Sequence, residues 1–267
     1  MLLADGRLEE GFALYEGRFT RLEGQVKKPP MSYAEWDGRP VERLLVWPEQ
    51  GVGDQILHAR WIVELAKRGV RVSLLCLPPV ARLFSTLPAQ LIVQAGRVSV
   101  PRHDAWAMIG SLAHRCGASL ETLPSRAYLS GRGAVGAPSG GIEICWRGDP
   151  RFPGNVARSL SEPATERLLK LGRSLLPEDT GAKDFQETAD IIAGLDLVIT
   201  VDTSIANLAG AMGKTVWVLL AKPCDWRWMV GRSDSPWYPS ARLFRQPQSG
   251  DWDTVLDEVE RELDSRA

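Results

Sequence analysis

Short apolar runs alternate with helical patterns along this chain, and that alternation constrains its fold more than any other feature. The run RLLVW at 43–47 precedes a glycine-rich loop, and apolar residues then recur at helical spacing at Ile56, Ala59 and Val63. Another apolar run follows at 70–77. Short continuous runs are typical of strands buried on both faces. The order strand, loop, helix, strand therefore predicts a parallel sheet covered by helices.

The same alternation continues to the end of the chain. Apolar runs that predict further strands lie at 90–94, 141–146, 195–202 and 214–220. Between the last two runs, Ile205, Leu208 and Met212 recur at helical spacing, and Gly213 ends that helix. An amphipathic pattern that begins at Trp252 predicts a terminal helix. We therefore predict an α/β fold with two lobes.

Glycine and proline divide the chain into regions. Before Pro29 and Pro30, a short stretch shows helical spacing, whereas GRGAVGAPSGG at 131–141 holds five glycines and no periodic apolar face. The second stretch has the composition of a linker. The predicted regions are a helical segment at 1–30, a first α/β lobe at 31–130, the linker at 131–141 and a second α/β lobe at 142–267.

The charge balance argues against two classes of partner. The 267 residues include 32 Lys and Arg against 33 Asp and Glu, so a nucleic-acid or membrane-surface partner is not expected. No run approaches the ~18 apolar residues of a membrane span, and the start MLLADGRLEE does not resemble a signal peptide. The cysteines are single and far from any histidine cluster, which predicts reduced thiols in a cytoplasmic protein and no zinc site.

The loop between the first strand and its helix contains the first candidate site. Gln50, Gly51 and Gly53 lead to Asp54, and the glycines let backbone N–H groups approach a ligand. Asp54 would lie at the carboxyl edge of a parallel sheet, where a carboxylate can accept a proton from an attacking hydroxyl. The alternative is that Asp54 only caps the helix. The spacing matches neither the phosphate-binding nor the dinucleotide-binding glycine motif.

A second strand-to-helix junction, Asp202, Thr203 and Ser204, is a candidate anion site. Hydroxyls and backbone N–H groups at a helix start suit a phosphate, although plain capping by Thr203 or Ser204 is equally compatible. Upstream, an arginine in the Trp146 segment or Arg158 has the chemistry to hold a diphosphate through two hydrogen bonds.

Aromatic residues gather in the third candidate site. The segments at 224–228 and 234–239 mix Trp226, Trp237 and Tyr238 with Arg and Asp, which favours stacking on a base or sugar. The alternative is a loop that packs these rings on its own domain. Asp251 and Asp253 imitate a metal-binding DxD motif, but their place at a helix start predicts capping.

Four segments together resemble a known family. They lie at 47–54, 195–203, 225–228 and 235–239. In this order they are similar to glycosyltransferase family 9 domains that follow tetratricopeptide repeats, and to ADP-heptose:lipopolysaccharide heptosyltransferases of the two-lobed GT-B fold. The resemblance covers roughly residues 32–265. The stretch LLADGRLEEGFALYEGRF looks like the last repeat of an array that is otherwise missing.

The resemblance implies an inverting, metal-independent transfer from a nucleotide sugar, with no further cofactor. Asp54 matches the family's proposed acceptor base, and the segment from Asp202 matches the one at the donor phosphates. The implied donor-binding residues are Trp146, Arg158, Asp202, Thr203, Ser204, Asn207, Asp225 and Trp226. Those on the acceptor side of the cleft are Gln50, Gly51, Gly53 and Tyr238. The acceptor, whether glycan, lipid-linked or protein, is not implied, and a homo-oligomer is compatible with the resemblance.

The chain departs from the family pattern at three places. Asn207 stands where histidine is usual, Asp149 stands where asparagine is common, and the stretch 162–184 is short. These departures keep a second hypothesis open, namely a degenerate GT-B domain that acts as a binding or scaffold module. A third is a doubly wound protein that binds another phosphorylated ligand.

Overall fold

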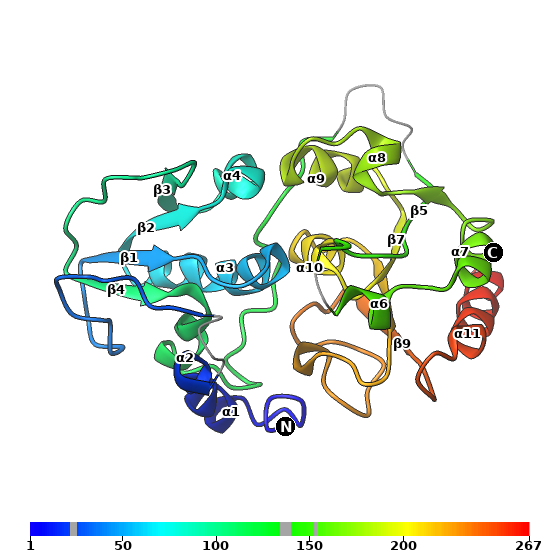
Figure 1. Cartoon of the computed structure of the whole chain (residues 1–267), viewed down its shortest axis with the longest axis horizontal. Coiled ribbons are helices and arrows are strands. Elements are labelled where there is room, and N and C mark those ends of the chain that lie inside the picture. Colours follow the sequence, from blue (N-terminus) through cyan, green and yellow to red (C-terminus); the bar gives the residue numbers. More distant parts are fainter. Residues whose placement is uncertain (22–25, 134–139, 152–153, 267) are drawn as a thin grey trace.

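Two parallel β-sheets with covering helices make up the protein (Figure 1). The computed structural model describes residues 1–21, 26–133, 140–151 and 154–266. The elements up to the end of the first sheet are α1 (Leu8–Tyr15), α2 (Arg18–Arg21), β1 (Arg43–Trp47), α3 (Val52–Lys67), β2 (Arg71–Cys76), α4 (Pro78–Phe84), β3 (Ala89–Val93), β4 (Ala105–Met108), the 3₁₀ helix η1 (Ile109–Ser111) and α5 (Leu112–Arg115).

The second half carries the other sheet. Its elements are β5 (Ile142–Cys145), α6 (Asn155–Arg158), α7 (Glu162–Leu168), β6 (Arg173–Ser174), α8 (Pro177–Thr180), α9 (Phe185–Ala193), β7 (Leu197–Val201), α10 (Ser204–Ala211), β8 (Val216–Leu220), the 3₁₀ helix η2 (Trp226–Trp228), β9 (Ala241–Arg245) and α11 (Trp252–Asp264). We call the first sheet with its helices the first lobe and the second sheet with its helices the second lobe.

The strand order of each sheet reverses at one position. The first sheet has the order β3-β2-β1-β4 and the second β6-β5-β7-β8-β9, with every neighbouring pair parallel. The order therefore reverses beside β1 in the first sheet and between β5 and β7 in the second. Open α/β folds bind ligands beyond the carboxyl ends of strands at such reversals. The predicted loops after β1 and β7 both start there.

The predicted α/β class with parallel strands is confirmed, and three strands were missed. β7 and β8 are buried at every position, as their continuous apolar runs predict. The missed strands are β4, β6 and β9: the first two have four and two residues, and β9 mixes three apolar residues with two arginines. Runs this short or mixed lack a distinctive pattern.

The chain reaches the second lobe before the predicted linker begins. The backbone N–H groups of Tyr128 and Leu129 both donate to the carbonyl oxygen of Ala211 on α10, over 2.9 and 3.2 Å. Residues 134–139 of the predicted linker at 131–141 lie outside the described residues. The domain boundaries themselves stay predictions.

The N-terminal segment packs between the lobes. Leu8 and Phe12 of α1 are at most 2% exposed, and the Phe12 ring meets those of Trp226 and Trp237 edge-on, at centroid distances of 5.6 and 6.1 Å. Its contacts therefore tie it to the rest of the protein, and its relation to tetratricopeptide repeats stays a prediction.

Several smaller predictions have a direct counterpart in the structure. The four cysteines, Cys76, Cys116, Cys145 and Cys224, are free thiols. Asp251 caps α11 by accepting a hydrogen bond from the Thr254 N–H over 3.1 Å, as predicted for the DxD imitation. In the described part of the chain, the helices lack the combined length and apolar character of a membrane span.

Candidate functional site

The loop between β1 and α3 carries the predicted base. Gly51 is the N-cap residue of α3, and its N–H donates to Asp54 Oδ2 over 3.0 Å. One carboxylate oxygen therefore caps the helix, as the alternative interpretation expects. The other oxygen, Oδ1, accepts a hydrogen bond from Arg227 Nη2 of the second lobe over 2.6 Å. Asp54 is thus both a cap and a contact between the lobes.

Arg227 is the cation at the centre of this contact. It belongs to η2, is 8% exposed, and donates from Nε to Asp225 Oδ1 over 2.8 Å. Burial disfavours its charge, yet the carboxylates of Asp54, Asp225 and Asp202 hold the pKa of Arg227 well above its ordinary value. Arg227 had no predicted role, because an arginine in an aromatic-rich loop shows no sequence pattern that separates a buried cation from an exposed one.

The side chains of the turn between β7 and α10 form hydrogen bonds within the protein. Thr203 is 4% exposed, and its Oγ1 accepts a hydrogen bond from the Ile205 N–H over 3.2 Å. Asn207 is 1% exposed, and it donates to the Thr203 carbonyl oxygen and accepts from the Tyr238 hydroxyl. These side chains are buried and bonded to one another or to the backbone, and the ligand contacts predicted for Thr203, Asn207 and Tyr238 stay predictions.

The first turns of α3 and α10 lie against each other (Figure 1). A Cβ at Gly53 would lie 3.1 Å from Asn207 Nδ2 and 3.4 Å from Ser204 Cα. A side chain at this position would crowd the Asn207 amide, so glycine favours the close contact of the two helices, and the ligand role predicted for Gly53 stays a prediction. The free N–H groups of both helix starts carry partial positive charge. Because the two helix starts lie side by side, their partial positive charges favour the binding of an anion nearby.

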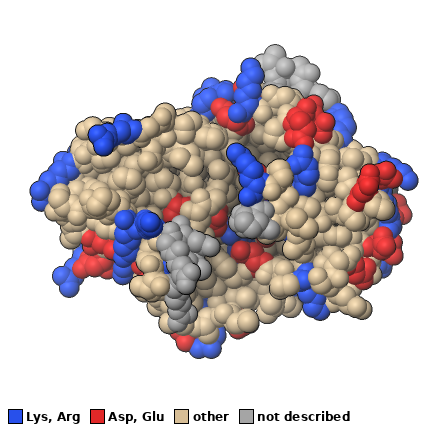
Figure 2. All heavy atoms as spheres, viewed as in Figure 1, with Lys and Arg blue, Asp and Glu red and all other residues tan. Residues whose placement is uncertain are grey.

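Carboxylates and arginines of the second lobe surround this point. Burial raises the pKa of Asp202 above its ordinary value, against the opposing charge of Arg227. Burial would also raise the pKa of Asp225, but the charge and hydrogen bonds of Arg227 bring that pKa below its ordinary value. The charge of Arg158 lowers both pKa values further, so the structure brings Arg158 to the same cluster. Figure 2 shows basic and acidic side chains along the seam between the lobes on the face viewed.

The segment after β5 leads toward this cluster. A Cβ at Gly148 would lie 2.7 Å from Arg158 Nη2, so glycine makes room for that guanidinium. Trp146 is half-buried against the core. Asp149 is exposed and accepts hydrogen bonds from Arg151, which lower its pKa to about 2. Arg151 therefore partly compensates the negative charge that Asp149 brings next to the predicted diphosphate site.

The aromatic loop is largely interior, which corrects the stacking prediction. Trp228, Trp237 and Tyr238 are at most 1% exposed. A Cβ at Gly210 would lie 2.4 Å from Tyr238 Cγ, so this ring is wedged against α10. Trp226 is half-buried, and its ring lies 6.0 Å from that of Tyr15.

The other predicted residues surround Asp54 and the start of α10. Gln50 and Gly51 are exposed in the loop before Asp54, and Ser204 is half-buried at the first position of α10. Their roles toward a ligand stay predictions, as do those of Trp146, Arg158, Asp202, Asp225 and Trp226. Among the residues whose positions are given, no group of three or more His, Cys, Asp or Glu side chains has the arrangement of a metal site.

Solved structures similar to this chain share its two-lobed architecture. Escherichia coli ADP-heptose lipopolysaccharide heptosyltransferase II aligns with a TM-score of 0.54 at 12% identity, over 84% of this chain and 100% of that one. E. coli heptosyltransferase WaaC with ADP aligns at 0.52 and 13% identity, over 83% and 98%. Dodecameric iron-containing heptosyltransferase TibC in complex with ADP-D-β-D-heptose aligns at 0.51 and 12%, over 90% and 81%. These likenesses show that the fold is the GT-B fold of heptosyltransferases.

One curated protein is similar in sequence. Protein FlbA of Caulobacter vibrioides is 28% identical over 316 aligned residues, which cover 97% of this chain and 53% of FlbA. The chain thus spans about half the length of the curated relative it matches. No protein-family model matches the sequence.

Proposed function

We propose that this protein is a glycosyltransferase that moves a sugar from a nucleotide sugar to an acceptor hydroxyl. The observation that carries the proposal is the Asp54–Arg227 contact, which joins the loop after β1 to the second lobe beside the start of α10. A potential base and a cationic, helix-start environment therefore meet at the crevice edges of a heptosyltransferase fold. Acid–base chemistry beside an anionic leaving group needs this pairing.

In the proposed reaction, the donor diphosphate lies in the second lobe near the start of α10. The backbone N–H groups of α10 and the charges of Arg158 and Arg227 stabilise it. Asp54 Oδ1 gives up its hydrogen bond to Arg227 and takes the proton of the acceptor hydroxyl, while Oδ2 keeps its bond to the Gly51 N–H. The acceptor oxygen bonds to the anomeric carbon from the face opposite the diphosphate, the bond between that carbon and the diphosphate oxygen breaks, and the nucleoside diphosphate leaves with the electron pair of that bond. The transfer inverts the anomeric configuration and uses no metal.

The first experiment identifies the nucleotide. The protein is titrated calorimetrically with ADP, GDP, UDP, CDP and dTDP, each with and without EDTA. We expect saturable binding of one nucleotide that EDTA does not change, and ADP is the first choice because two similar structures are described with ADP or ADP-heptose. Release of that nucleotide from its sugar conjugate then measures turnover. Lack of binding to all five would reject the proposal, and a requirement for metal would reject its metal-independent form.

A degenerate GT-B binding module is the second candidate. The observation in its favour is that Asn207, at the position where the family usually has histidine, is buried and hydrogen-bonded within the protein. A module of this kind would bind a nucleoside diphosphate but release none from any sugar conjugate, even when mixed glycan, lipid-linked and protein acceptors are present. The same two assays therefore separate the candidates.

A further inference from the structure

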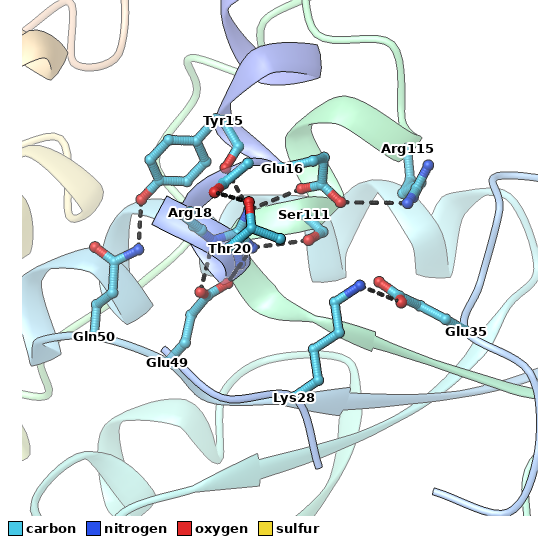
Figure 3. Close-up of polar contacts among 12 residues, drawn as sticks. Tyr15, Glu16, Arg18, Thr20, Lys28, Glu35, Glu49, Gln50, Ser111 and Arg115 are labelled. Carbon is cyan, nitrogen blue, oxygen red and sulfur yellow. Dashed lines mark hydrogen bonds and ion pairs between the residues drawn. The ribbon is translucent and has the colours of Figure 1, made fainter. Parts of the chain in front are cut away.

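A buried ion pair joins the N-terminal helices to the loop that carries Asp54 (Figure 3). Arg18 is 4% exposed; its Nε donates to Glu49 Oε2 over 2.9 Å and its Nη2 to Glu49 Oε1 over 2.7 Å. Arg18 Nη2 also donates to Ser111 Oγ over 2.8 Å. A guanidinium that binds a carboxylate through two parallel hydrogen bonds fixes its orientation as well as its position.

Gly110 of the first lobe also holds the Glu49 carboxylate. The Gly110 N–H donates to Glu49 Oε1 over 2.7 Å, and a Cβ at Gly110 would lie 2.5 Å from that oxygen. Buried ion pairs stabilise proteins poorly compared with apolar residues of the same volume. We therefore assign the Arg18–Glu49 pair, which is bonded at both carboxylate oxygens, to fixing the geometry of the β1–α3 loop and not to stabilising the fold.

The residue after Glu49 needs this support. Gln50 has a φ of +58°, a conformation that residues other than glycine seldom adopt. Its side-chain Nε2 donates to the Tyr15 hydroxyl of α1 (Figure 3). Gly51 and Asp54 follow within four residues, so α1 and α2 hold the start of the loop that presents the proposed base.

The same segment also supports the other side of the Asp54–Arg227 contact. The rings of Phe12 and Tyr15 lie 5.6 and 6.0 Å from that of Trp226, the neighbour of Arg227 in η2. The N-terminal helices therefore contact both the loop of Asp54 and the loop of Arg227.

We infer that Arg18, through Glu49, is a positioning residue for Asp54. This inference rests on the proposed function, because Asp54 matters as a base only if the protein transfers a sugar. The hydrogen bonds of Arg18 go to Glu49, Ser111 and its own segment, and none of them reaches Asp54 or Arg227. Arg18 therefore acts on Asp54 through the backbone of the loop. Tyr15 supports the same loop through the side chain of Gln50.

The test compares Arg18→Met with Arg18→Lys and a matched control, Arg115→Met. Arg115 pairs with Glu16 of the same N-terminal segment over 3.3 Å, but its bonds do not reach Glu49. We expect the kcat for ADP release from ADP-heptose, or from the conjugate that the nucleotide titration selects, to fall at least tenfold in Arg18→Met. Nucleotide Kd stays within twofold. Arg18→Lys keeps the charge without the parallel hydrogen bonds and restores only part of kcat, and Arg115→Met stays within twofold of wild type.

Amide hydrogen exchange of the peptide at 48–54 gives a readout that needs no substrate. It quickens in Arg18→Met and not in Arg115→Met if Arg18 orders this loop. Unchanged kcat and exchange in Arg18→Met, or equal losses in both variants, would overturn the inference. If wild type neither binds nor turns over any nucleotide sugar, the proposed function fails, and exchange alone decides whether Arg18 orders the loop.

If Arg18→Met does not fold, the double variant Arg18→Met/Glu49→Leu takes its place in the test. This variant removes both buried charges and leaves none unpaired. We expect it to fold, to bind nucleotide as wild type does, and to retain the slow turnover of the single variant. Wild-type turnover in the folded double variant would overturn the positioning role.

Discussion

The two strand-to-helix turns that meet between the lobes are built in different ways. At the start of α10, Thr203 caps its own helix and Asn207 bonds back to the Thr203 carbonyl oxygen, so the cap itself is formed within five residues, and only the Asn207 amide oxygen uses a distant partner, the Tyr238 hydroxyl. At the start of α3, the loop depends on residues far away in the chain: Glu49 on Arg18, and Asp54 on Arg227.

This difference separates a locally determined turn from one that the whole fold determines. A helix start that caps itself presents its N–H groups in any context where the helix forms. A loop held by partners 31 and 173 residues away has its shape only when both lobes and the N-terminal helices are assembled. Changes in the β1–α3 loop should therefore act on turnover and on the contact between lobes, and changes at α10 on local stability.

The largest effect is expected for Asp54→Asn. An amide can still accept the hydrogen bond of the Gly51 N–H, but it cannot take a proton, so turnover should fall by about 10²- to 10⁴-fold. Nucleotide Kd should change little, because the donor is proposed to lie in the second lobe. The measurement is nucleotide release under single-turnover conditions, with exposed Asp37→Asn as the control for a lost charge. Full turnover in Asp54→Asn would reduce this residue to a helix cap.

Arg227→Met should cause the largest loss of stability. It leaves the carboxylates of Asp54 and Asp225 near each other without their shared cation, and removing one partner of a buried ion pair lowers the free energy of unfolding by about 3–5 kcal/mol. Both carboxylates are partly exposed, which favours the lower end of that range. Urea unfolding measures it. Arg232→Met, which breaks the exposed pair with Asp234, should lower stability by less than about 1 kcal/mol. Equal losses would mean that the lobes do not depend on Arg227.

The free energy of unfolding should fall at acidic pH because of His58, which lies one turn after Asp54 on α3. Burial, aided by the charges of Arg227, Arg18 and Arg60, holds the pKa of His58 well below the ordinary 6.5. Below pH 6.5 the unfolded chain therefore binds a proton that the folded protein refuses, so stability falls as pH falls. Between pH 7 and 5.5 the loss from this group is about 1 kcal/mol.

The check is urea unfolding of wild type and His58→Gln at both pH values. The glutamine variant should lack this part of the acid sensitivity. If the two proteins lose stability in parallel between pH 7 and 5.5, His58 is not the source.

The smallest effect is expected at the locally closed turn. Thr203→Val removes the cap of α10 and should lower the free energy of unfolding by about 1 kcal/mol. Because the Thr203 side chain is buried, nucleotide Kd should stay within about threefold, as calorimetry can show. A tenfold loss of affinity with unchanged stability would support the phosphate-binding role that the sequence predicts for Thr203.

Much of the fold could be predicted because its signals are local. β1 matches the predicted run at 43–47 residue for residue, and α10 begins one residue before the predicted Ile205. Short mixed strands such as β9 were missed because two of its five residues are arginines and its pattern is not distinctive. Asp54 was predicted from its place after a strand, whereas its partner Arg227 has no local signal.

Local sequence patterns predicted the order of the main elements, the parallel arrangement of the main strands and the loops that follow β1 and β7. These features depend on periodicity, glycine and capping, which act within a few residues. Which side chains are buried and which meet depends on the packing of the whole chain, which places Tyr238 and Asn207 in the interior, brings Arg227 to Asp54 and sets Arg18 behind the loop of the proposed base. Burial and ion pairing are properties of the assembled surroundings, so residues distant along the chain acquire these roles only when both lobes have packed.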